Sequence, residues 1–195
     1  ISKVPLKHGG DFDDINRIFT FLNQKLVLSH HRVRHVTNRT VATMTTRLYT
    51  IPSLSMKSKT IFPGEVHHVT PDGYALVHRK TQLHIYRFYQ KHGWKLLTSF
   101  ESIIDHSCEF AAAKIIPSKN IVISVKGEII EIFDYFHKKR EKFESNNKKE
   151  LRCIEYCEKR DELYLISTLD VQVYSMTKNG LKFKNSIDMP LHDSL

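Results

Sequence analysis

The sequence has no uninterrupted apolar run close to the roughly 20 residues that a helix needs to cross a bilayer. Its first residues, ISKVPLKHGGDFDD, contain no apolar segment of the kind that forms a signal peptide. Only three cysteines are present, Cys108, Cys153 and Cys157, and an odd number of thiols is typical of a reducing compartment. We therefore expect an intracellular protein of the cytoplasm or nucleus, without a transmembrane segment.

The short motifs of common catalytic chemistry are also missing. The sequence has no G-x-S-x-G, no glycine-rich phosphate loop and no H-E-x-x-H, and only seven of its 195 residues are glycine. We interpret the carboxylates of Asp11, Asp13 and Asp14 as a solvated acidic end. A non-enzymatic protein is therefore expected, with no cofactor and no evident small-molecule substrate.

Metal binding is not predicted either, although the chain has twelve histidines. His30-His31 and His67-His68 are adjacent pairs, and adjacent side chains of a strand point to opposite faces. Cys153 and Cys157 supply half of a zinc pattern, and no second pair of ligands accompanies them. We interpret these cysteines as buried thiols of a strand.

Acidic residues are absent from a window of fifty residues, Ile15 to Gly64, which holds eight basic residues and so accounts for +8 of the net charge of +9. Such a field attracts anionic partners. Within the window, LSHHRVRHVTNRT (28–40) is interpreted as an exposed edge strand or a connection between sheets. The candidate contact residues for an acidic partner, with nucleic acid as an alternative, are Arg32, Arg34, His35, Arg39, Arg47, Lys57 and Lys59.

What the sequence does contain is a repeat. The segments VTPDGYALVHRKTQLHIYRF, IIPSKNIVISVKGEIIEIFDY and EKRDELYLISTLDVQVYSM each read as a turn, an apolar strand, a tight connection and a second strand. Their first strands begin at Tyr74, Ile121 and Leu163, at spacings of 47 and 42 residues. A strand before each turn and an outer strand at 94–100, 140–145 and 180–187 complete four strands per unit. Repeats of this length with several short strands are typical of propeller blades.

A more degenerate unit precedes these three. TVATM (40–44), RLYTI (47–51) and SKTIF (58–62) are predicted as its second, third and fourth strands, and FDDINRIFTFLNQKL (12–26) as either a helix or a strand. We therefore expect one all-β module, 1–195, that forms a β-propeller-like array of about four four-stranded blades at 15–64, 65–104, 105–147 and 148–190. Because an array of four blades would leave exposed edges, we expect it to be part of a larger propeller that a longer chain completes, with completion by a partner as the alternative. The charged run HKKREKFESNNKKE (137–150) is interpreted as a solvated excursion of the third blade, with a phosphate-contacting loop as the alternative.

The units at 65–190 resemble the WD-repeat pattern, in which a P-D-G turn, an apolar strand, a short turn and a strand ending in Trp-Asp follow one another. Phe133-Asp134 approximates that ending, whereas Tyr86-Arg87 and Tyr174-Ser175 depart from it and no Gly-His pair begins a blade. These departures indicate a divergent propeller. A weaker resemblance joins RLYTIPSLSMKSKTIF to the propellers of citron-homology proteins.

The resemblance to WD repeats implies protein binding more often than catalysis, which is an analogy at the level of the fold. We expect a scaffold subunit of a multiprotein complex whose basic first blade contacts an acidic partner. The alternatives are a propeller subunit associated with RNA or DNA, and a membrane-trafficking propeller of the citron-homology type.

Overall fold

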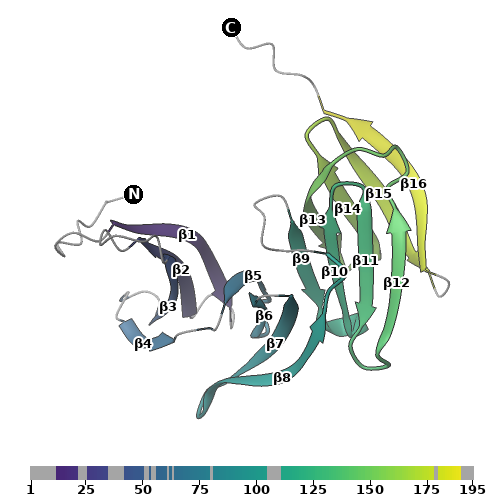
Figure 1. The fold of residues 1–195 in the computed structure, drawn as a ribbon. Helices are drawn as coiled ribbons and strands as arrows, with labels where there is room; N and C mark the ends of the chain where they lie inside the picture. The colour runs from purple at the N-terminus through teal and green to yellow at the C-terminus, as the bar shows by residue number, and fades with distance from the viewer. Residues whose placement is uncertain are drawn as a thin grey trace, which may run out of the picture.

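The computed structural model of the chain describes residues 12–21, 26–34, 42–50, 53, 56–60, 62, 64–79, 81–104, 111–177 and 180–189. Within them, sixteen β-strands form four antiparallel sheets of four strands each (Figure 1). The one helical element of the described residues is a 3-10 turn, η1 (Pro117–Lys119). The predicted all-β class and the propeller-like array of four-stranded sheets are therefore confirmed.

Each sheet is a simple meander whose strands lie side by side in sequence order. The first sheet contains β1 (Phe12–Phe21), β2 (Leu26–Arg34), β3 (Ala42–Thr50) and β4 (Met56–Thr60). The second contains β5 (Glu65–Val69), β6 (Tyr74–Arg79), β7 (Gln82–Tyr89) and β8 (Gly93–Glu101). The third contains β9 (Ala112–Ile116), β10 (Ile121–Lys126), β11 (Ile129–Asp134) and β12 (Lys139–Glu144). The fourth contains β13 (Leu151–Cys157), β14 (Glu162–Ser167), β15 (Asp170–Thr177) and β16 (Gly180–Asp188).

Successive sheets meet along their first strands. β1 contacts β5, β5 contacts β9, and β9 contacts β13. The first strand of each sheet is therefore the innermost one, and β4, β8, β12 and β16 are the outermost strands. This is the arrangement of blades in a propeller.

The third sheet is buried on both faces because a sheet packs against each of them. Ile121, Ile123 and Val125 of β10 join a core shared with the fourth sheet, while Val122 joins a core shared with the second. Alternate residues of β10 thus enter two different cores, which is why IVISV is apolar at every position except Ser124.

The fourth sheet has only one covered face in the described structure. In β14 the burial alternates: Leu163, Leu165 and Ser167 are buried, whereas Tyr164 and Ile166 are half-buried. The buried residues of β14 face the third sheet, and the others face away from it. The contrast with β10 marks the fourth sheet as the last of the described array.

The turns between the first and second strands have the predicted chemistry. Gly73 follows Pro71-Asp72 and has a φ of 90°, and Thr70 Oγ1 accepts a hydrogen bond of 2.9 Å from the Tyr74 amide. In the third sheet, Asn120 adopts the left-handed conformation after η1. Gly64 is required by a close approach, since a Cβ atom there would lie 1.8 Å from the carbonyl oxygen of His78.

The first sheet differs from its prediction in two respects. TVATM and RLYTI do not form two strands, because residues 42–50 make a single strand, β3. The second strand is β2, which contains most of the basic segment. The segment at 12–21 is a strand, as one of its two interpretations held.

A half-buried histidine lies where the second and third sheets meet. His68, on the innermost strand β5, is close to Lys114 and hydrogen-bonds to the backbone of Ile115 on β9. Burial, together with the charge of Lys114, lowers its pKa from 6.5 to about 3. The folded chain therefore holds His68 neutral at pH values where the unfolded chain would bind a proton.

We predict that this histidine makes the fold sensitive to acid. A folded-state pKa below the unfolded value means that the stabilisation is fully present above pH 6.5 and is lost as the pH falls toward 3. Between pH 7 and pH 5 the loss attributable to His68 is about 2 kcal/mol. Urea unfolding at both pH values should show a correspondingly smaller loss for His68→Leu. The control is His92→Gln, in an exposed turn; an equal loss for His68→Leu and the wild type would contradict the prediction.

Candidate functional site

The predicted basic contact residues fall on three strands of the first sheet. Arg32 and Arg34 lie on β2, Arg47 lies on β3, and Lys57 and Lys59 lie on β4, while His35 and Arg39 are outside the described residues. The sequence suggested an edge strand for this basic segment. That interpretation is wrong for residues 28–34, because β2 pairs with both β1 and β3. The strong strand character of LVLSHHRVR outweighs its charge.

The register of the first sheet brings acidic positions to this region. Asp14 on β1 pairs with Arg32, and Asp13 pairs with Val33. Asp13 and Asp14 are therefore part of the strand β1, and Asp11 lies outside the described residues. On the other side of the sheet, Arg47 pairs with Lys59, so two basic positions are direct neighbours.

Exposed apolar side chains lie along the outer edge of the second sheet, on both of its faces, and on the adjoining turn of the third sheet. They are Tyr89, Leu96 and Leu97 of β7 and β8, with exposed fractions of 39%, 52% and 46%, and Phe136, which is 70% exposed. Lys138 Nζ donates a hydrogen bond of 2.9 Å to Thr98 Oγ1, and this contact brings the turn that carries Phe136 beside β8. We call these four side chains the β8 surface.

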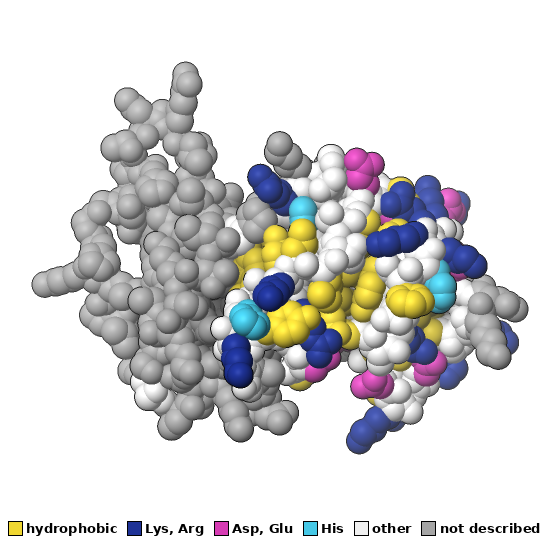
Figure 2. Space-filling model, turned by 90° about the horizontal axis from the view of Figure 1, so that it is seen from below, with side chains coloured by type: hydrophobic (Ala, Val, Ile, Leu, Met, Phe, Trp, Pro, Cys, Tyr) yellow, Lys and Arg dark blue, Asp and Glu magenta, His cyan; other side chains and the backbone are white. Residues whose placement is uncertain are grey.

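Basic side chains accompany the β8 surface. The Lys95 ammonium lies 5.8 Å from the centre of the Tyr89 ring, and Arg140, which hydrogen-bonds to the carbonyl of Glu101, lies over the Phe133 ring at 5.6 Å. Figure 2 shows hydrophobic side chains across the middle of one face, with Lys and Arg side chains around them. Apolar patches with polar surroundings are typical of protein-binding surfaces.

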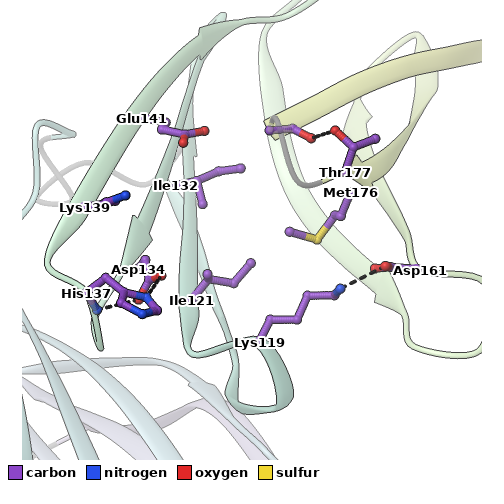
Figure 3. Close-up of a pocket in the computed structure, with 11 residues that line it drawn as sticks. Lys119, Ile121, Ile132, Asp134, His137, Lys139, Glu141, Asp161, Met176 and Thr177 are labelled. Carbon is purple, nitrogen blue, oxygen red and sulfur yellow. Dashed lines mark hydrogen bonds and ion pairs between the residues drawn. The ribbon is translucent and has the colours of Figure 1, made fainter.

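A pocket of about 550 Å³ lies between the third and fourth sheets (Figure 3). Its apolar walls are Ile121 and Ile132 from the third sheet and Met176 from β15. Gly180 closes one side: a Cβ atom there would lie 2.8 Å from the Phe143 ring, so glycine allows β16 to approach β12. The remaining lining residues are polar: Lys119, Asp134, His137, Lys139, Glu141, Asp161 and Thr177.

The charged groups at one end of the pocket hold the two sheets together. Lys119 Nζ lies 2.9 Å from Asp161 Oδ2, and the Tyr156 hydroxyl donates a hydrogen bond of 2.9 Å to Asp161 Oδ1. The hydrogen bond from Lys119 contributes most to lowering the pKa of Asp161. Burial raises the pKa of the Tyr156 hydroxyl, which stays protonated and keeps donating.

The His137–Asp134 pair at the pocket resembles a catalytic dyad but serves a turn. His137 Nδ1 lies 2.7 Å from Asp134 Oδ2, and Asp134 Oδ1 accepts hydrogen bonds from the backbone amides of Phe136 and His137. Thr177 is the one hydroxyl group among the lining residues, and it donates to the carbonyl of Gly180. The described lining residues therefore fix a shape and a charge pattern, and no activated nucleophile is among them.

The described histidines and cysteines that were considered as metal ligands lie at different places in the structure. His67 is buried on β5 with its ring 5.8 Å from that of His78. Cys157 is half-buried, whereas Cys153 is exposed, so the prediction of Cys153 as a buried thiol is wrong. Cys153 pairs with Ile166, which lies on the face of the fourth sheet that no described sheet covers. Across the described parts of the chain, no three His, Cys, Asp or Glu side chains are grouped to hold a metal ion. Cys108 lies outside those parts.

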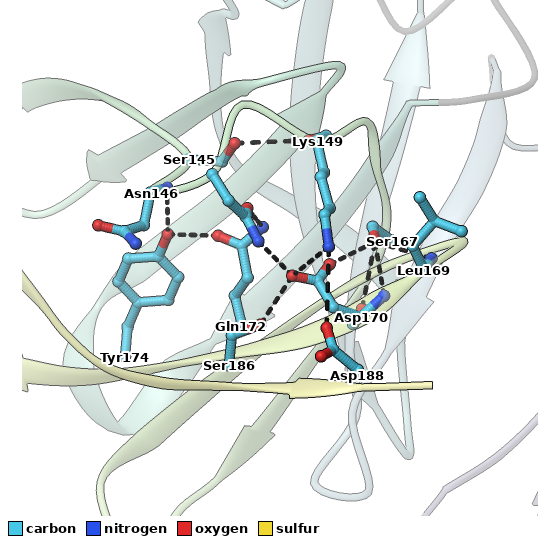
Figure 4. Close-up of polar contacts among 11 residues, drawn as sticks. Ser145, Asn146, Lys149, Ser167, Leu169, Asp170, Gln172, Tyr174, Ser186 and Asp188 are labelled. Carbon is cyan, nitrogen blue, oxygen red and sulfur yellow. Dashed lines mark hydrogen bonds and ion pairs between the residues drawn. The ribbon is translucent and has the colours of Figure 1, made fainter. Parts of the chain in front are cut away.

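Most residues of the charged run 137–150 are exposed to solvent, as predicted, and the run also contains a strand. Residues 139–144 form the outermost strand β12, close to the outer strand predicted at 140–145. Residues 145–150 connect the third sheet to the fourth. That connection is fixed by a buried polar network, shown in Figure 4.

Asp170, at the start of β15, is the centre of the network and is fully buried. Its carboxylate accepts hydrogen bonds from Ser167 Oγ at 2.5 Å, from Ser186 Oγ at 2.8 Å and from Asn147, and Lys149 Nζ lies 3.4 Å away. Burial disfavours the charged form, but these hydrogen bonds and the lysine outweigh it, so the pKa of Asp170 is lowered.

A second chain of hydrogen bonds joins the same connection to the middle of β15. Asn147 accepts a hydrogen bond from Gln172, whose Oε1 accepts one of 2.7 Å from the Tyr174 hydroxyl. Tyr174 in turn accepts one of 3.0 Å from the amide of Asn146. Sequence reasoning did not single out these residues, although a polar residue two positions before each closing aromatic is visible in HIY, EIF and QVY.

Among the residues described, no helix is long and apolar enough to cross a lipid bilayer.

Comparison of the sequence with known families and with curated proteins finds no match. The structure is similar to a protein from Desulfotomaculum acetoxidans that is described as functionally unknown, with a TM-score of 0.58, 13% identity, and coverage of 88% of this chain and 55% of that one. It is also similar to a protein from Lactobacillus plantarum, with a TM-score of 0.62, 12% identity, and coverage of 91% and 56%. This chain spans a little over half the length of these structures, and the likeness concerns the fold alone.

We predict that the Asp170 network is a major source of stability. Asp170→Asn keeps the shape but replaces an acceptor oxygen with a donor facing Asn147 and Lys149, so the free energy of unfolding should fall by about 3 kcal/mol. The matched control is Asp188→Asn, because Asp188 is near the same lysine but is 92% exposed. Its effect should stay within about 0.5 kcal/mol. Equal effects of the two variants in denaturant unfolding would show that the network does not stabilise the fold.

Proposed function

We propose that the chain is a non-enzymatic interaction module, an arc of a propeller that holds other protein subunits of a complex. The observation that carries this proposal is the β8 surface. Phe136 and Leu96, which are 70% and 52% exposed, would be buried by a partner. Burying apolar area of this kind contributes about 25 cal/mol per Å² before the costs of association are subtracted.

The surroundings of the β8 surface favour a partner with acidic residues beside its apolar ones. Lys95, Lys138 and Arg140 are exposed close to the apolar side chains. The first sheet adds the acid-poor window, with its eight basic residues, as a second region of positive charge. An acidic protein segment is thus the proposed partner of the basic residues, and a nucleic acid is an outcome of the test below.

A larger propeller is part of the proposal. The half-buried Tyr164 and Ile166, with Ile187 at 54% exposure, form a face of the fourth sheet like those that are covered in the third. The similar solved structures are longer than this chain. We propose that further sheets of a longer chain cover this face.

The first prediction of this proposal concerns partner recruitment. The chain is immobilised and incubated with a nuclease-treated extract of the cells from which it comes. It should retain protein partners in stoichiometric amounts. Leu96→Ser combined with Phe136→Ser should reduce that retention at least tenfold, with unchanged thermal stability. Leu169→Ser is the matched control, since it removes an exposed apolar side chain, 45% exposed, from the turn between β14 and β15. If Leu96→Ser/Phe136→Ser and Leu169→Ser retain the same partners equally, the β8 surface is not the contact.

The same experiment has a second arm for the basic residues. Arg32, Arg34 and Arg39 are changed together to Glu, and retention is followed at rising salt concentrations. An acidic protein partner should be lost from this variant in nuclease-treated extract, and wild-type retention should weaken with salt. Retention that disappears with nuclease alone would assign the basic residues to nucleic acid instead.

A further inference from the structure

Two opposite charges on β12 line the pocket between the third and fourth sheets without a charged partner. Lys139 and Glu141 are both exposed, and neither side chain forms an ion pair or hydrogen bond with the residues that the structure describes. The other charged lining groups are paired, Lys119 with Asp161 and His137 with Asp134. The pocket thus presents one positive and one negative group that packing of the sheets leaves unused.

The spacing of these two charges matches an extended chain. Lys139 and Glu141 are two residues apart on one strand, so they share a face of β12 and lie roughly 7 Å apart. Alternate side chains of an extended peptide have the same spacing. An acidic and a basic side chain of such a peptide could each lie opposite its complement, as cross-strand pairs do.

The inner part of the pocket supplies an apolar seat. Ile121 and Ile132 are 7% and 8% exposed, and Met176 is half-buried against the same core. Figure 3 shows these three side chains between the two sheets, with Glu141 and Lys139 on the β12 side. An apolar side chain fits this seat, and the flexible thioether of Met176 can adapt to its shape.

The strands that bound the pocket also offer backbone hydrogen bonds. β12 and β16 are the outermost strands of their sheets, so each pairs on one side only among the described strands. Exposed strand edges of this kind add an extended peptide as a further strand. Edge hydrogen bonds, an apolar seat and two charges at strand spacing favour a peptide over a small apolar molecule.

We propose that the pocket between β12 and β16 binds an extended peptide segment in which an apolar side chain accompanies one acidic and one basic side chain at alternate positions. The apolar side chain contacts Ile121, Ile132 and Met176. The acidic side chain pairs with Lys139, and the basic one pairs with Glu141. This site is separate from the β8 surface, so its failure would leave the proposed function standing.

The probes are six synthetic peptides of five residues, labelled with fluorescein, in which Glu, Lys and Leu occupy the alternate positions in every order and Thr separates them. Fluorescence anisotropy measures their binding to the chain. At least one order should bind, and the double variant Lys139→Glu/Glu141→Lys should weaken its binding at least tenfold. The double variant should instead prefer the order in which Glu and Lys are exchanged. That gain identifies ion pairing, because a merely misfolded variant would bind no peptide.

The matched control is Lys142→Glu/Glu144→Lys, which exchanges two exposed charges of the same strand outside the pocket lining and should leave binding unchanged. Met176→Glu places a charge in the apolar seat and should abolish binding of every peptide. The proposal is overturned if none of the six peptides binds the wild type. It is equally overturned if the exchange at 139 and 141 leaves the preferred order the same, since a purely apolar ligand would then explain the pocket.

Discussion

The arrangement of the third and fourth sheets depends on buried polar side chains that anchor the connection entering each of them. Glu131, the third residue of β11, is 1% exposed, and its carboxylate accepts hydrogen bonds from Ser102 Oγ at 2.5 Å and from the Ile103 amide at 3.2 Å. Arg140 Nε completes the set at 3.0 Å. Because an unpaired buried carboxylate is very unfavourable, the connection from the second sheet must stay where it satisfies Glu131. The position of the third sheet relative to the second follows from this requirement.

The third residue of the third strand is also a buried polar residue in the two neighbouring sheets, but its contacts differ from those of Glu131. In the fourth sheet, Gln172 is the third residue of β15 and holds the connection through Asn147. In the second sheet, His84 is the third residue of β7, and its ring stacks on Tyr86 at 6.3 Å. Burial lowers the pKa of His84 and keeps it neutral, so this sheet is anchored by packing more than by charge. The side chains of the β8 surface and the two charges of the pocket, Lys139 and Glu141, lie toward the outer edges of the sheets, where they are available to partners.

Much of the fold could be predicted from the sequence because strand periodicity and turn chemistry are local. The spacing of Tyr74, Ile121 and Leu163 located the three regular sheets, and the P-D-G turn located one of their sharp connections. The first sheet was harder: basic residues in β2 suggested an edge, whereas the pairing of β2 with two strands is a long-range property. The pocket could not be predicted, since it depends on how closely β16 approaches β12 at Gly180. The basic contact residues and the scaffold role stay predictions.

Amide hydrogen exchange at Ile103 tests the anchoring most directly. In Glu131→Ala the acceptor of this amide is gone, so protection of Ile103 should fall at least a hundredfold and the free energy of unfolding by about 3 kcal/mol. Glu128→Ala, at an exposed position of the same sheet, should change neither quantity. If exchange at Ile103 is the same in Glu131→Ala as in the wild type under conditions where the sheets remain folded, the buried carboxylate does not hold the connection.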